Sequence, residues 1–274
     1  MPSIALFQMN SGINPDANCD AICDAIQGAA DRGAAMLFAP EMCTLLDRDR
    51  GRASKLIVPE KNNAQIEQLR EACLRRAIWC SLGSIPVLLD NGKFANRSIV
   101  LTDKGEVAAR YDKLHMFDVD LDTGESWRES SAYQAGERVV TVETPVGKLG
   151  LTICYDIRFP ALFEELGRQE CDIISIPAAF TVPTGEAHWH VLQRARAIEA
   201  TAFVVAAAQS GSHEDGRTTY GHSMVTDPWG KVIIDMKHTS GLAVVDVDLN
   251  RISEVRTQIP SLANKRAIPK STVS

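Results

Sequence analysis

The sequence lacks several features that would assign it at once to a common class of protein. Its 274 residues contain no run of about 18 apolar residues, so no membrane-spanning helix is predicted. The first residues have neither a basic segment nor a long apolar stretch, so no secretory signal peptide is expected. There is also no excess of basic residues: 35 Asp and Glu stand against 29 Lys and Arg, which argues against a nucleic-acid-binding surface.

Familiar catalytic and cofactor-binding motifs are missing as well. The chain has no Gly-x-Gly-x-x-Gly or Gly-x-x-x-x-Gly-Lys-Ser/Thr loop, no Gly-x-Ser-x-Gly turn and no His-Glu-x-x-His pair. Its 7 cysteines are an odd number, with no Cys-x-x-Cys pair and no zinc-ligand spacing. This pattern favours a reducing, cytoplasmic environment over a disulfide scaffold.

What the sequence does contain is an alternation of strand-like and helix-like segments. Short apolar runs at 4–9 and 35–39 predict buried strands, each followed by a helical pattern. This β-α-β-α-β opening is typical of a layered α/β fold. The expected strands are 4–9, 35–39, 80–86, 94–101, 107–111, 139–144, 148–154, 172–176, 202–208, 223–227, 231–235 and 241–247. The expected helices are 16–32, 62–79, 158–168, 185–201 and 249–257.

The organisation along the chain predicts one domain. No low-complexity linker, charge block or internal repeat divides the sequence. We expect a single domain over residues 1–260, followed by a polar tail over 261–274 that could lie at a dimer interface. A polar loop of about twenty residues is expected between 114 and 134, and a loop of that length in a compact domain usually has a function.

Three predicted strand ends carry residues with catalytic chemistry. Cys154 ends an apolar strand and precedes a helical segment, where α/β folds place ligands and where backbone N–H groups can hold an oxyanion. Glu41 follows another buried strand and could act as a general base. Lys113 follows the strand 107–111 and could stabilise an oxyanion or lower the pKa of a thiol.

Each of these residues also has an ordinary structural explanation. Cys154 could be a small buried core residue, Glu41 a turn or cap residue, and Lys113 a solvated loop lysine. Considered together, the carboxylate, the ammonium and the thiol form a more specific combination, because a cysteine nucleophile needs a base or a nearby cation.

Three segments around these residues resemble the signature regions of the nitrilase superfamily of carbon–nitrogen hydrolases. They are Pro-Glu at 40–41, Tyr-Asp-Lys-Leu-His at 111–115 and Cys-Tyr-Asp-Ile-Arg-Phe-Pro at 154–160. They occur in the order and at the separations typical of that family, and the likeness runs from about residue 4 to 260. The third segment is the most specific of the three, whereas Pro-Glu alone carries little weight.

The resemblance implies a fold and a set of catalytic residues. The fold would be a four-layer α-β-β-α sandwich with two mixed sheets, which pairs into an α-β-β-α-α-β-β-α dimer. Glu41 would be the general base and acid, Lys113 would stabilise the oxyanion, and Cys154 would be the nucleophile. A second glutamate in the loop after the lysine is assigned to Glu129, with Glu125 as a weaker candidate.

Further segments resemble the amidase branch of this superfamily, and most of all the deaminated glutathione amidases and the related ω-amidases. They are Ala-His-Trp at 187–189, Arg-Ala-Arg-Ala-Ile-Glu at 194–199, Tyr-Gly-His-Ser-Met-Val at 220–225 and Asp-Pro-Trp-Gly at 227–230. The resemblance implies that Arg158 binds a substrate carboxylate, although an ion pair with Asp156 or Glu164 would also explain it. The expected pocket further includes Tyr155, Thr184 and Phe180.

The expected activity is therefore hydrolysis of the amide bond of a small carboxylate-bearing substrate through a thioester on Cys154. Deaminated glutathione is the first expectation for that substrate. Alternatives on the same site are 2-oxoglutaramate, an N-carbamoyl amino acid or a nitrile, and a non-catalytic binding protein on this fold is the outside alternative. The mechanism needs no metal and no organic cofactor. His188 and His190 do not form a metal site together, because residues two apart on a helix point to different sides.

Overall fold

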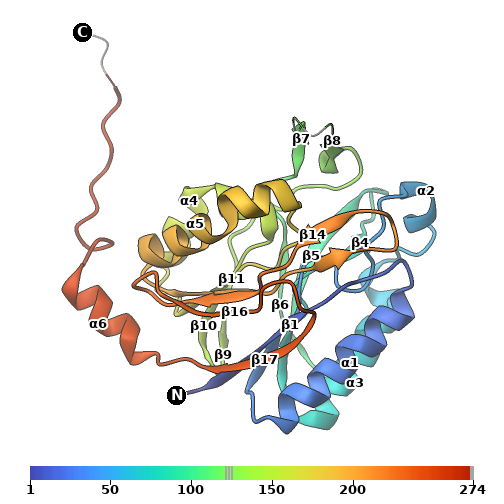
Figure 1. The fold of residues 1–274 in the computed structure, drawn as a ribbon, viewed down its shortest axis with the longest axis horizontal. Coiled ribbons are helices and arrows are strands. Elements are labelled where there is room, and N and C mark those ends of the chain that lie inside the picture. The colour runs from blue at the N-terminus through green and yellow to red at the C-terminus, as the bar shows by residue number, and fades with distance from the viewer. Residues whose placement is uncertain (121, 123, 125, 272–274) are drawn as a thin grey trace.

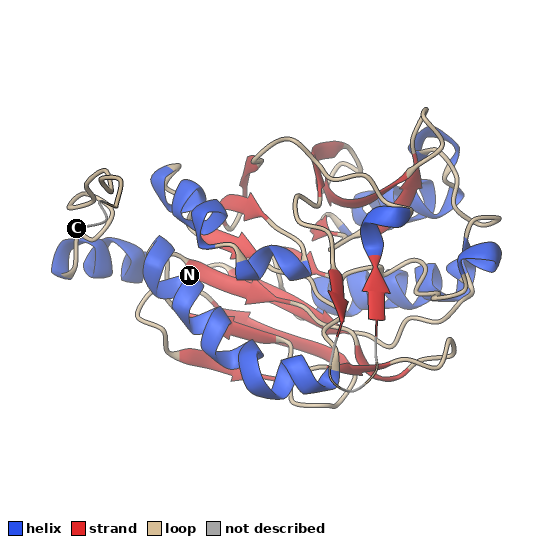
Figure 2. Cartoon of the chain, turned by 90° about the horizontal axis from the view of Figure 1, so that it is seen from above, coloured by secondary structure: helices blue, strands red, loops and turns tan. Residues whose placement is uncertain are grey.

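The computed structural model describes residues 1–120, 122, 124 and 126–271. Two β-sheets lie face to face between two layers of helices, which gives the order α-β-β-α (Figures 1 and 2). Both sheets contain parallel and antiparallel pairs, so the predicted sandwich of two mixed sheets is confirmed. Within the described part, no helix is both long and apolar enough to cross a lipid bilayer.

The first sheet has seven strands in the order β17-β1-β2-β3-β5-β4, with β6 beside β5. Its central strands β1, β2 and β3 are parallel, and the others pair antiparallel. The strands are β1 (Ser3–Gln8), β2 (Met36–Phe38), β3 (Trp79–Ser81), β4 (Ile85–Leu88), β5 (Phe94–Leu101), β6 (Val107–Asp112) and β17 (Gly241–Asp246).

The second sheet has six strands in the order β16-β15-β12-β11-β10-β9. Again the central strands, β10, β11 and β12, are parallel, so their carboxyl ends meet at one edge of the sheet. The strands are β9 (Thr141–Thr144), β10 (Gly147–Leu151), β11 (Ile173–Ser175), β12 (Phe203–Ala206), β15 (Met224–Thr226) and β16 (Val232–Asp235).

Helices cover the outer face of each sheet. α1 (Pro15–Asp31) and α3 (Ala64–Arg76) pack on the first sheet, and α4 (Pro160–Arg168) and α5 (Val182–Ala200) pack on the second (Figure 1). The short α2 (Arg50–Ala53) and the turn η1 (Glu60–Asn62) lie between β2 and α3, and α6 (Asn250–Gln258) follows β17.

The alternation of side chains along the strands builds two separate cores. Ile4 and Leu6 of β1 point into the core between the two sheets, whereas Ala5 points into the core beneath α1 and α3. This alternation follows from the period of two in a β-strand, so both faces of a central strand must be apolar. That is why these strands read as continuous apolar runs in the sequence.

Several element boundaries differ from those predicted. The helix expected over 62–79 is shorter, because Asn63 caps its first turn and Ala77 ends it in the left-handed conformation at φ 50°. The strand expected over 80–86 is two strands, β3 and β4. They are separated at Gly83, whose φ is +64° and where an added Cβ would lie 2.1 Å from the carbonyl oxygen of Ala39.

The other differences lie near the ends of the sheets. The segment expected to be a loop over 114–134 contains the hairpin β7 (Asp118–Asp120) and β8 (Ser126–Arg128) and the turn η2 (Glu129–Ser131). A second small ribbon, β13 (Ser210–Ser212) with β14 (Thr218–Tyr220), was not predicted at all. A 3-10 turn, η3 (Cys154–Arg158), precedes α4, so this helix begins at Pro160 rather than at 158.

Candidate active site

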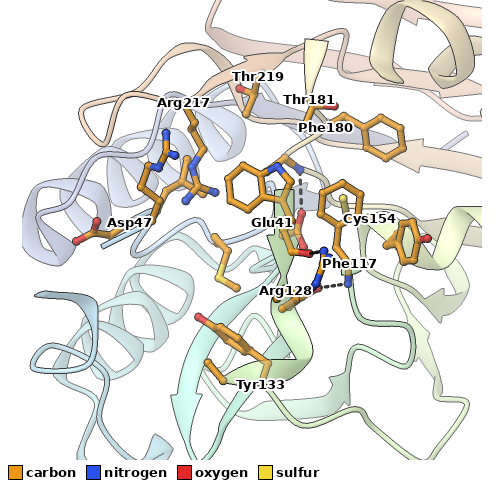
Figure 3. A pocket seen from close by; sticks show the side chains of 18 of the residues that line it. Glu41, Asp47, Phe117, Arg128, Tyr133, Cys154, Phe180, Thr181, Arg217 and Thr219 are labelled. Carbon is orange, nitrogen blue, oxygen red and sulfur yellow. Dashed lines mark hydrogen bonds between the residues drawn. The ribbon is translucent and has the colours of Figure 1, made fainter. Parts of the chain in front are cut away.

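A pocket of about 660 Å³ opens where strands of both sheets end (Figure 3). Three of the sequence-predicted residues meet in it: Glu41 after β2, Lys113 directly after β6, and Cys154 after β10. The hairpins β7–β8 and β13–β14 contribute further wall residues. The predicted carboxylate, ammonium and thiol therefore share one cavity, although they are far apart in the sequence.

Lys113 lies at the centre of a buried network of charges. Its Nζ is 2.9 Å from Oε1 of Glu41 and 2.9 Å from Oε2 of Glu129, and its side chain is 2% exposed. The amide of Asn96 donates to Glu41 at 3.0 Å and to Glu129 at 3.1 Å. The backbone N–H of Ala179 donates to the other oxygen of Glu41 at 2.9 Å. Each charge in this buried cluster therefore has a partner, as burial of charge requires.

These contacts set the protonation states of the pair. Burial by itself raises the pKa of Glu41, but the ammonium of Lys113 and the hydrogen bonds to the carboxylate outweigh it, so the pKa lies below its usual value. Burial by itself lowers the pKa of Lys113, but the carboxylates of Glu129 and Glu41 outweigh it and raise the pKa well above its usual value. Glu41 is thus a carboxylate and Lys113 an ammonium at neutral pH.

Cys154 lies in a strained turn at the start of η3. Its φ is +48°, in the left-handed region that a residue with a side chain rarely adopts, and its N–H donates to the carbonyl of Pro177 at 2.8 Å. Among the described residues, the next backbone N–H, that of Tyr155, has no acceptor. It is an orphan donor of the first helical turn and lies beside the thiol, where an oxyanion would form.

The Cys154 thiol is protonated in this arrangement. Burial and then the negative charge of Glu41 raise its pKa well above the usual value, and Lys113 only partly opposes them. The site therefore does not hold a preformed thiolate. Attack on a carbonyl requires that the proton leave together with bond formation, and the adjacent carboxylate of Glu41 is the group that can accept it.

Asp156 fixes the turn that carries Cys154, a role that no pattern in the sequence indicates. Its fully buried carboxylate accepts hydrogen bonds from the hydroxyl of Tyr111 at 2.6 Å and from the backbone N–H of Ile153 at 2.9 Å. It also accepts from the backbone N–H of His115 at 3.0 Å and lies 2.7 Å from Nδ1 of that ring. One side chain thus joins the Cys154 turn to the segment that carries Lys113.

Of the two glutamates proposed for the loop after the lysine, Glu129 lies in the pocket. Besides Lys113 and Asn96, it binds the backbone N–H of Phe117 at 2.7 Å, which closes the base of the β7–β8 hairpin. Glu125 lies outside the residues that the structure describes. Glu129 therefore takes part in the charge network directly.

The residues predicted to bind substrate all line the same cavity. The guanidinium of Arg158 lies 5.8 Å from the ring centre of Tyr155 and 5.4 Å from that of Phe180, and its Nη1 is 3.3 Å from Nδ1 of His188. The hydroxyl of Thr184 faces that of Thr181 at 2.8 Å.

The structural alternative for Arg158 is not found. The carboxylate of Asp156 is engaged by Tyr111, His115 and Ile153, and Glu164 pairs with Lys265. Arg158 thus makes no ion pair among the described residues and keeps its charge available to the pocket.

Several residues of the site were missed by sequence reasoning. Asn96 has no catalytic motif around it in the sequence, yet it bridges both glutamates, because β5 pairs with β6 and brings it opposite Lys113. The wall formed by Asp47, Tyr133 and Arg217 (Figure 3) comes from three separate loops and has no motif in the sequence.

A group of side chains elsewhere could hold a metal ion. Ligand atoms of His190, His222 and Asp235 lie within 4.8 Å of one another, away from the pocket. Both rings are hydrogen-bonded to Asp235, at 3.1 and 2.9 Å, and the ammonium of Lys237 lies 2.8 Å from the same carboxylate. These contacts explain why the three side chains lie together without a metal ion: they form a hydrogen-bonded network centred on Asp235. His188, which was not expected to share a metal with His190, lies 3.3 Å from Arg158 instead.

Comparison with known proteins gives the family. The model of the carbon–nitrogen hydrolase family matches residues 3–257. The chain belongs to the carbon–nitrogen hydrolase family. It is 43% identical over 213 residues to the deaminated glutathione amidase of Yersinia enterocolitica, covering 76% of this chain and 74% of that protein. It is 38% identical over 275 residues to that of Mus musculus, covering 97% and 84%.

Solved structures agree with this membership. The NitFhit protein of C. elegans matches this hydrolase with a TM-score of 0.89 and 34% identity over 97% of the present chain. The present chain covers 65% of that protein, so it spans somewhat less than two thirds of its length. Nit3 of Saccharomyces cerevisiae, a nitrilase-superfamily member, matches with a TM-score of 0.85 and 26% identity over 94% of each chain.

The protein is thus a hydrolase that acts on carbon–nitrogen bonds other than peptide bonds. The geometry of its pocket fits such chemistry, since a thiol, a carboxylate and an ammonium converge beside the backbone N–H of Tyr155, which has no acceptor in the described part of the chain.

Proposed function

We propose that this hydrolase is an amidase that cleaves deaminated glutathione through a thioester on Cys154. The observation that carries the proposal is the buried ion network of Glu41, Lys113 and Glu129 beside the strained turn of Cys154. The names of relatives that are 43% and 38% identical support the choice of substrate.

In the first step, the thiol of Cys154 attacks the amide carbonyl carbon. The carboxylate of Glu41 takes the thiol proton, because it is ionised and lies in the same buried site. The carbonyl oxygen becomes an oxyanion, held by the ammonium of Lys113 and the backbone N–H of Tyr155. Preorganised donors of this kind contribute roughly 3–4 kcal/mol each to transition-state stabilisation.

The tetrahedral adduct then collapses with loss of the amine. Glu41 returns its proton to the leaving nitrogen, the carbon–nitrogen bond breaks, and a thioester remains on Cys154. Water then attacks the thioester, with Glu41 again as base, and releases the carboxylate product and the thiol. In this second half, Glu129 helps to hold Lys113 and the water in position, since it binds the ammonium directly. No metal or organic cofactor takes part in this scheme.

Arg158 is proposed to bind the carboxylate of the acyl part of the substrate. It lies four residues after Cys154, keeps its charge unpaired among the described residues, and is flanked by the rings of Tyr155 and Phe180. Thr184 contributes a hydroxyl at the same wall. A bidentate guanidinium–carboxylate contact would fix which end of the substrate faces the thiol.

We also propose that residues 1–260 act as one domain and that two copies pair through the outer face of α5. Val191 and Ile198 of this helix are 67% and 47% exposed, and Trp229 nearby is 46% exposed, which is costly for a surface that faces water. Residues 261–271 extend away from the body (Figure 1), and this part of the tail is proposed to reach the partner. Light scattering on the wild type and on Val191→Glu tests this pairing.

A cytoplasmic location is proposed on the cysteines. All seven are free, and six of them are buried, which suits a reducing compartment. Besides a second copy of the chain, the expected partner is the small-molecule substrate, and neither nucleic acid nor a membrane is expected to bind.

The test of the activity is product release by purified wild type, Cys154→Ala and Cys23→Ala. The panel contains deaminated glutathione, 2-oxoglutaramate, an N-carbamoyl amino acid and a nitrile. We expect deaminated glutathione to be turned over best, Cys154→Ala to be inactive, and Cys23→Ala, which lacks a thiol outside the pocket, to match the wild type. Preference for 2-oxoglutaramate would make the protein an ω-amidase. Turnover by Cys154→Ala above a few per cent of wild type would overturn the mechanism.

A further inference from the structure

The pocket is larger than the acyl half of the proposed substrate requires. Its volume of about 660 Å³ lies in the range of sites that enclose drug-sized ligands, whereas a five-carbon acyl group fills a small part of it. In Figure 3, Cys154 and Arg217 lie on opposite sides of the view, with Glu41 between them. The wall around Arg217 is therefore available to the leaving amine.

The guanidinium of Arg217 is hydrogen-bonded through Nε, whereas its two Nη groups face no acceptor among the described residues. Its Nε donates to Oδ2 of Asp215 at 2.7 Å, and the same fully buried carboxylate accepts the backbone N–H groups of Arg217 and Arg48. Among the described residues, neither Nη group of Arg217 has a hydrogen-bond partner. The side chain of Arg217 is 16% exposed, so its Nη donors are held in position and are less solvated than those of a surface arginine.

Trp127 forms the second part of this wall. The guanidinium of Arg217 lies over its indole ring, 5.0 Å from the ring centre. The indole N–H is buried, and among the described residues it has no acceptor. A buried donor without a partner is unusual in a native protein, and an acceptor supplied by a ligand would satisfy it.

The other charged side chains near this wall are bound by neighbouring groups or lie in solvent. Asp47 is bound by Arg52 at 2.6 Å, Arg128 is bound by Asp120 at 2.7 Å, and Arg50 donates to the backbone carbonyl of Arg128 at 2.5 Å. Arg48 is exposed. The Nη groups of Arg217 are thus positioned positive donors of this wall, and the nearby carboxylates of Asp47 and Asp120 are bound by Arg52 and Arg128.

We infer that Arg217 and Trp127 form a second anion subsite, which binds a carboxylate carried by the leaving amine. The inference rests on the proposed function and narrows it. The substrate class would be an amide that bears one carboxylate on the acyl side, at Arg158, and another on the amine side, at Arg217. An amide that releases plain ammonia, such as 2-oxoglutaramate, leaves this subsite empty.

The test compares two substrates that differ only at the leaving group. They are deaminated glutathione and its C-terminal carboxamide, and the readout is the ratio of their kcat/KM values for each variant. A ratio cancels any difference in folded fraction between variants. For the wild type we expect the free acid to be favoured by about 10- to 100-fold, the range for charge-assisted hydrogen bonds. For Arg217→Gln we expect a ratio of about 3 or less.

Two further variants sharpen the comparison. Arg128→Gln removes a charge of the same kind that is already bound to Asp120, so its ratio should stay at the wild-type value. Trp127→Phe keeps a ring under Arg217 but removes the indole N–H. Its ratio of kcat/KM values should therefore lie between that of the wild type and that of Arg217→Gln. The inference is overturned if the wild type does not discriminate, if Arg217→Gln keeps the preference, or if Arg128→Gln loses it equally.

These outcomes differ from failure of the proposed function. If both substrates are turned over and Arg217→Gln keeps the preference for the free acid, the second subsite is refuted and the amidase assignment still holds. Absence of Cys154-dependent turnover on either substrate overturns the amidase assignment and the subsite with it.

Discussion

Replacement of Lys113 by methionine is the perturbation whose outcome depends most directly on the buried network. Methionine has a similar length and is apolar, so it removes the ammonium with little change in packing. In the wild type, the ammonium contacts Glu41 and Glu129 at 2.9 Å each, and its side chain is 2% exposed. Lys113→Met leaves these carboxylates held only by Asn96 and backbone N–H groups.

The magnitude and its pH dependence follow from this geometry. Loss of one partner from a buried ion pair costs about 3–5 kcal/mol of unfolding free energy. In the wild type, Glu41 has a lowered pKa, so its contribution to stability is present above its unfolded pKa and is lost on acidification. In Lys113→Met, burial is no longer opposed by the ammonium, so the pKa of Glu41 should rise above its unfolded value.

The sign of the pH dependence is therefore reversed in the variant. A group with a raised folded pKa loses stability as pH increases, by about 1.4 kcal/mol per pH unit, between the unfolded and the folded pKa. The destabilisation of Lys113→Met relative to wild type should be smaller near pH 5 than near pH 8, where Glu41 must be buried as an unpaired charge or keep its proton.

Urea unfolding of both proteins at about pH 5 and about pH 8, at equal protein concentration, measures this difference. Lys104→Met, at an exposed turn between β5 and β6, is the matched control and should change stability by less than about 0.5 kcal/mol. If Lys113→Met were no more destabilising than this control at either pH, the reasoning from a buried charge network would be refuted.

Three other substitutions test single parts of the site. Asp156→Asn should lower kcat/KM by about 10- to 1,000-fold with the fold retained by circular dichroism, because the acceptor that holds the Cys154 turn loses its charge. Glu41→Gln should lower kcat by about 10²- to 10⁴-fold in steady-state assays. It should nevertheless speed alkylation of Cys154 by iodoacetamide near neutral pH. Burial and the Glu41 charge both raise the pKa of the thiol, and the substitution removes the charge, so a larger fraction of the thiol is ionised. Gly185→Ala should lower the thermal unfolding temperature, at a cost of about 1–3 kcal/mol, since its Cβ would lie 2.2 Å from Cγ of Tyr220.

Each of these has a matched control. Asp90→Asn is the control for Asp156→Asn, and Glu106→Gln is the control for Glu41→Gln. Both replace an exposed carboxylate by its amide and should leave turnover at the wild-type level. Gly28→Ala, inside α1, meets only the end of the Leu242 side chain and should be tolerated. Wild-type kinetics for Asp156→Asn, slower alkylation in Glu41→Gln, or an unchanged unfolding temperature for Gly185→Ala would contradict the respective explanation.

The sequence predicted the architecture because the relevant signals are local. Period-two and period-3.6 patterns placed strands such as 94–101 and 107–111 and most helices within a few residues. The exceptions depended on contacts between distant segments. The strand expected over 80–86 is divided because Gly83 approaches the backbone at Ala39 and Pro40, and neither residue signals that approach in the sequence.

The candidate site shows the same division. Glu41, Lys113 and Cys154 could be named because each follows a strand and lies in a segment that resembles a family signature. Asn96 and Asp156 could not be assigned roles, because their function is to join segments that only the paired strands bring together.

By itself, the sequence determined the layered α/β class, the absence of common cofactor motifs and the three chemical groups at strand ends. These follow from composition, periodicity and short motifs, which are properties of neighbouring residues. Only the tertiary structure decided how the charges pair, which arginines stay free and where the second wall of the pocket lies. Those properties depend on distances of a few ångströms between residues far apart in the chain, because burial and Coulomb interactions are set by spatial and not by sequence separation.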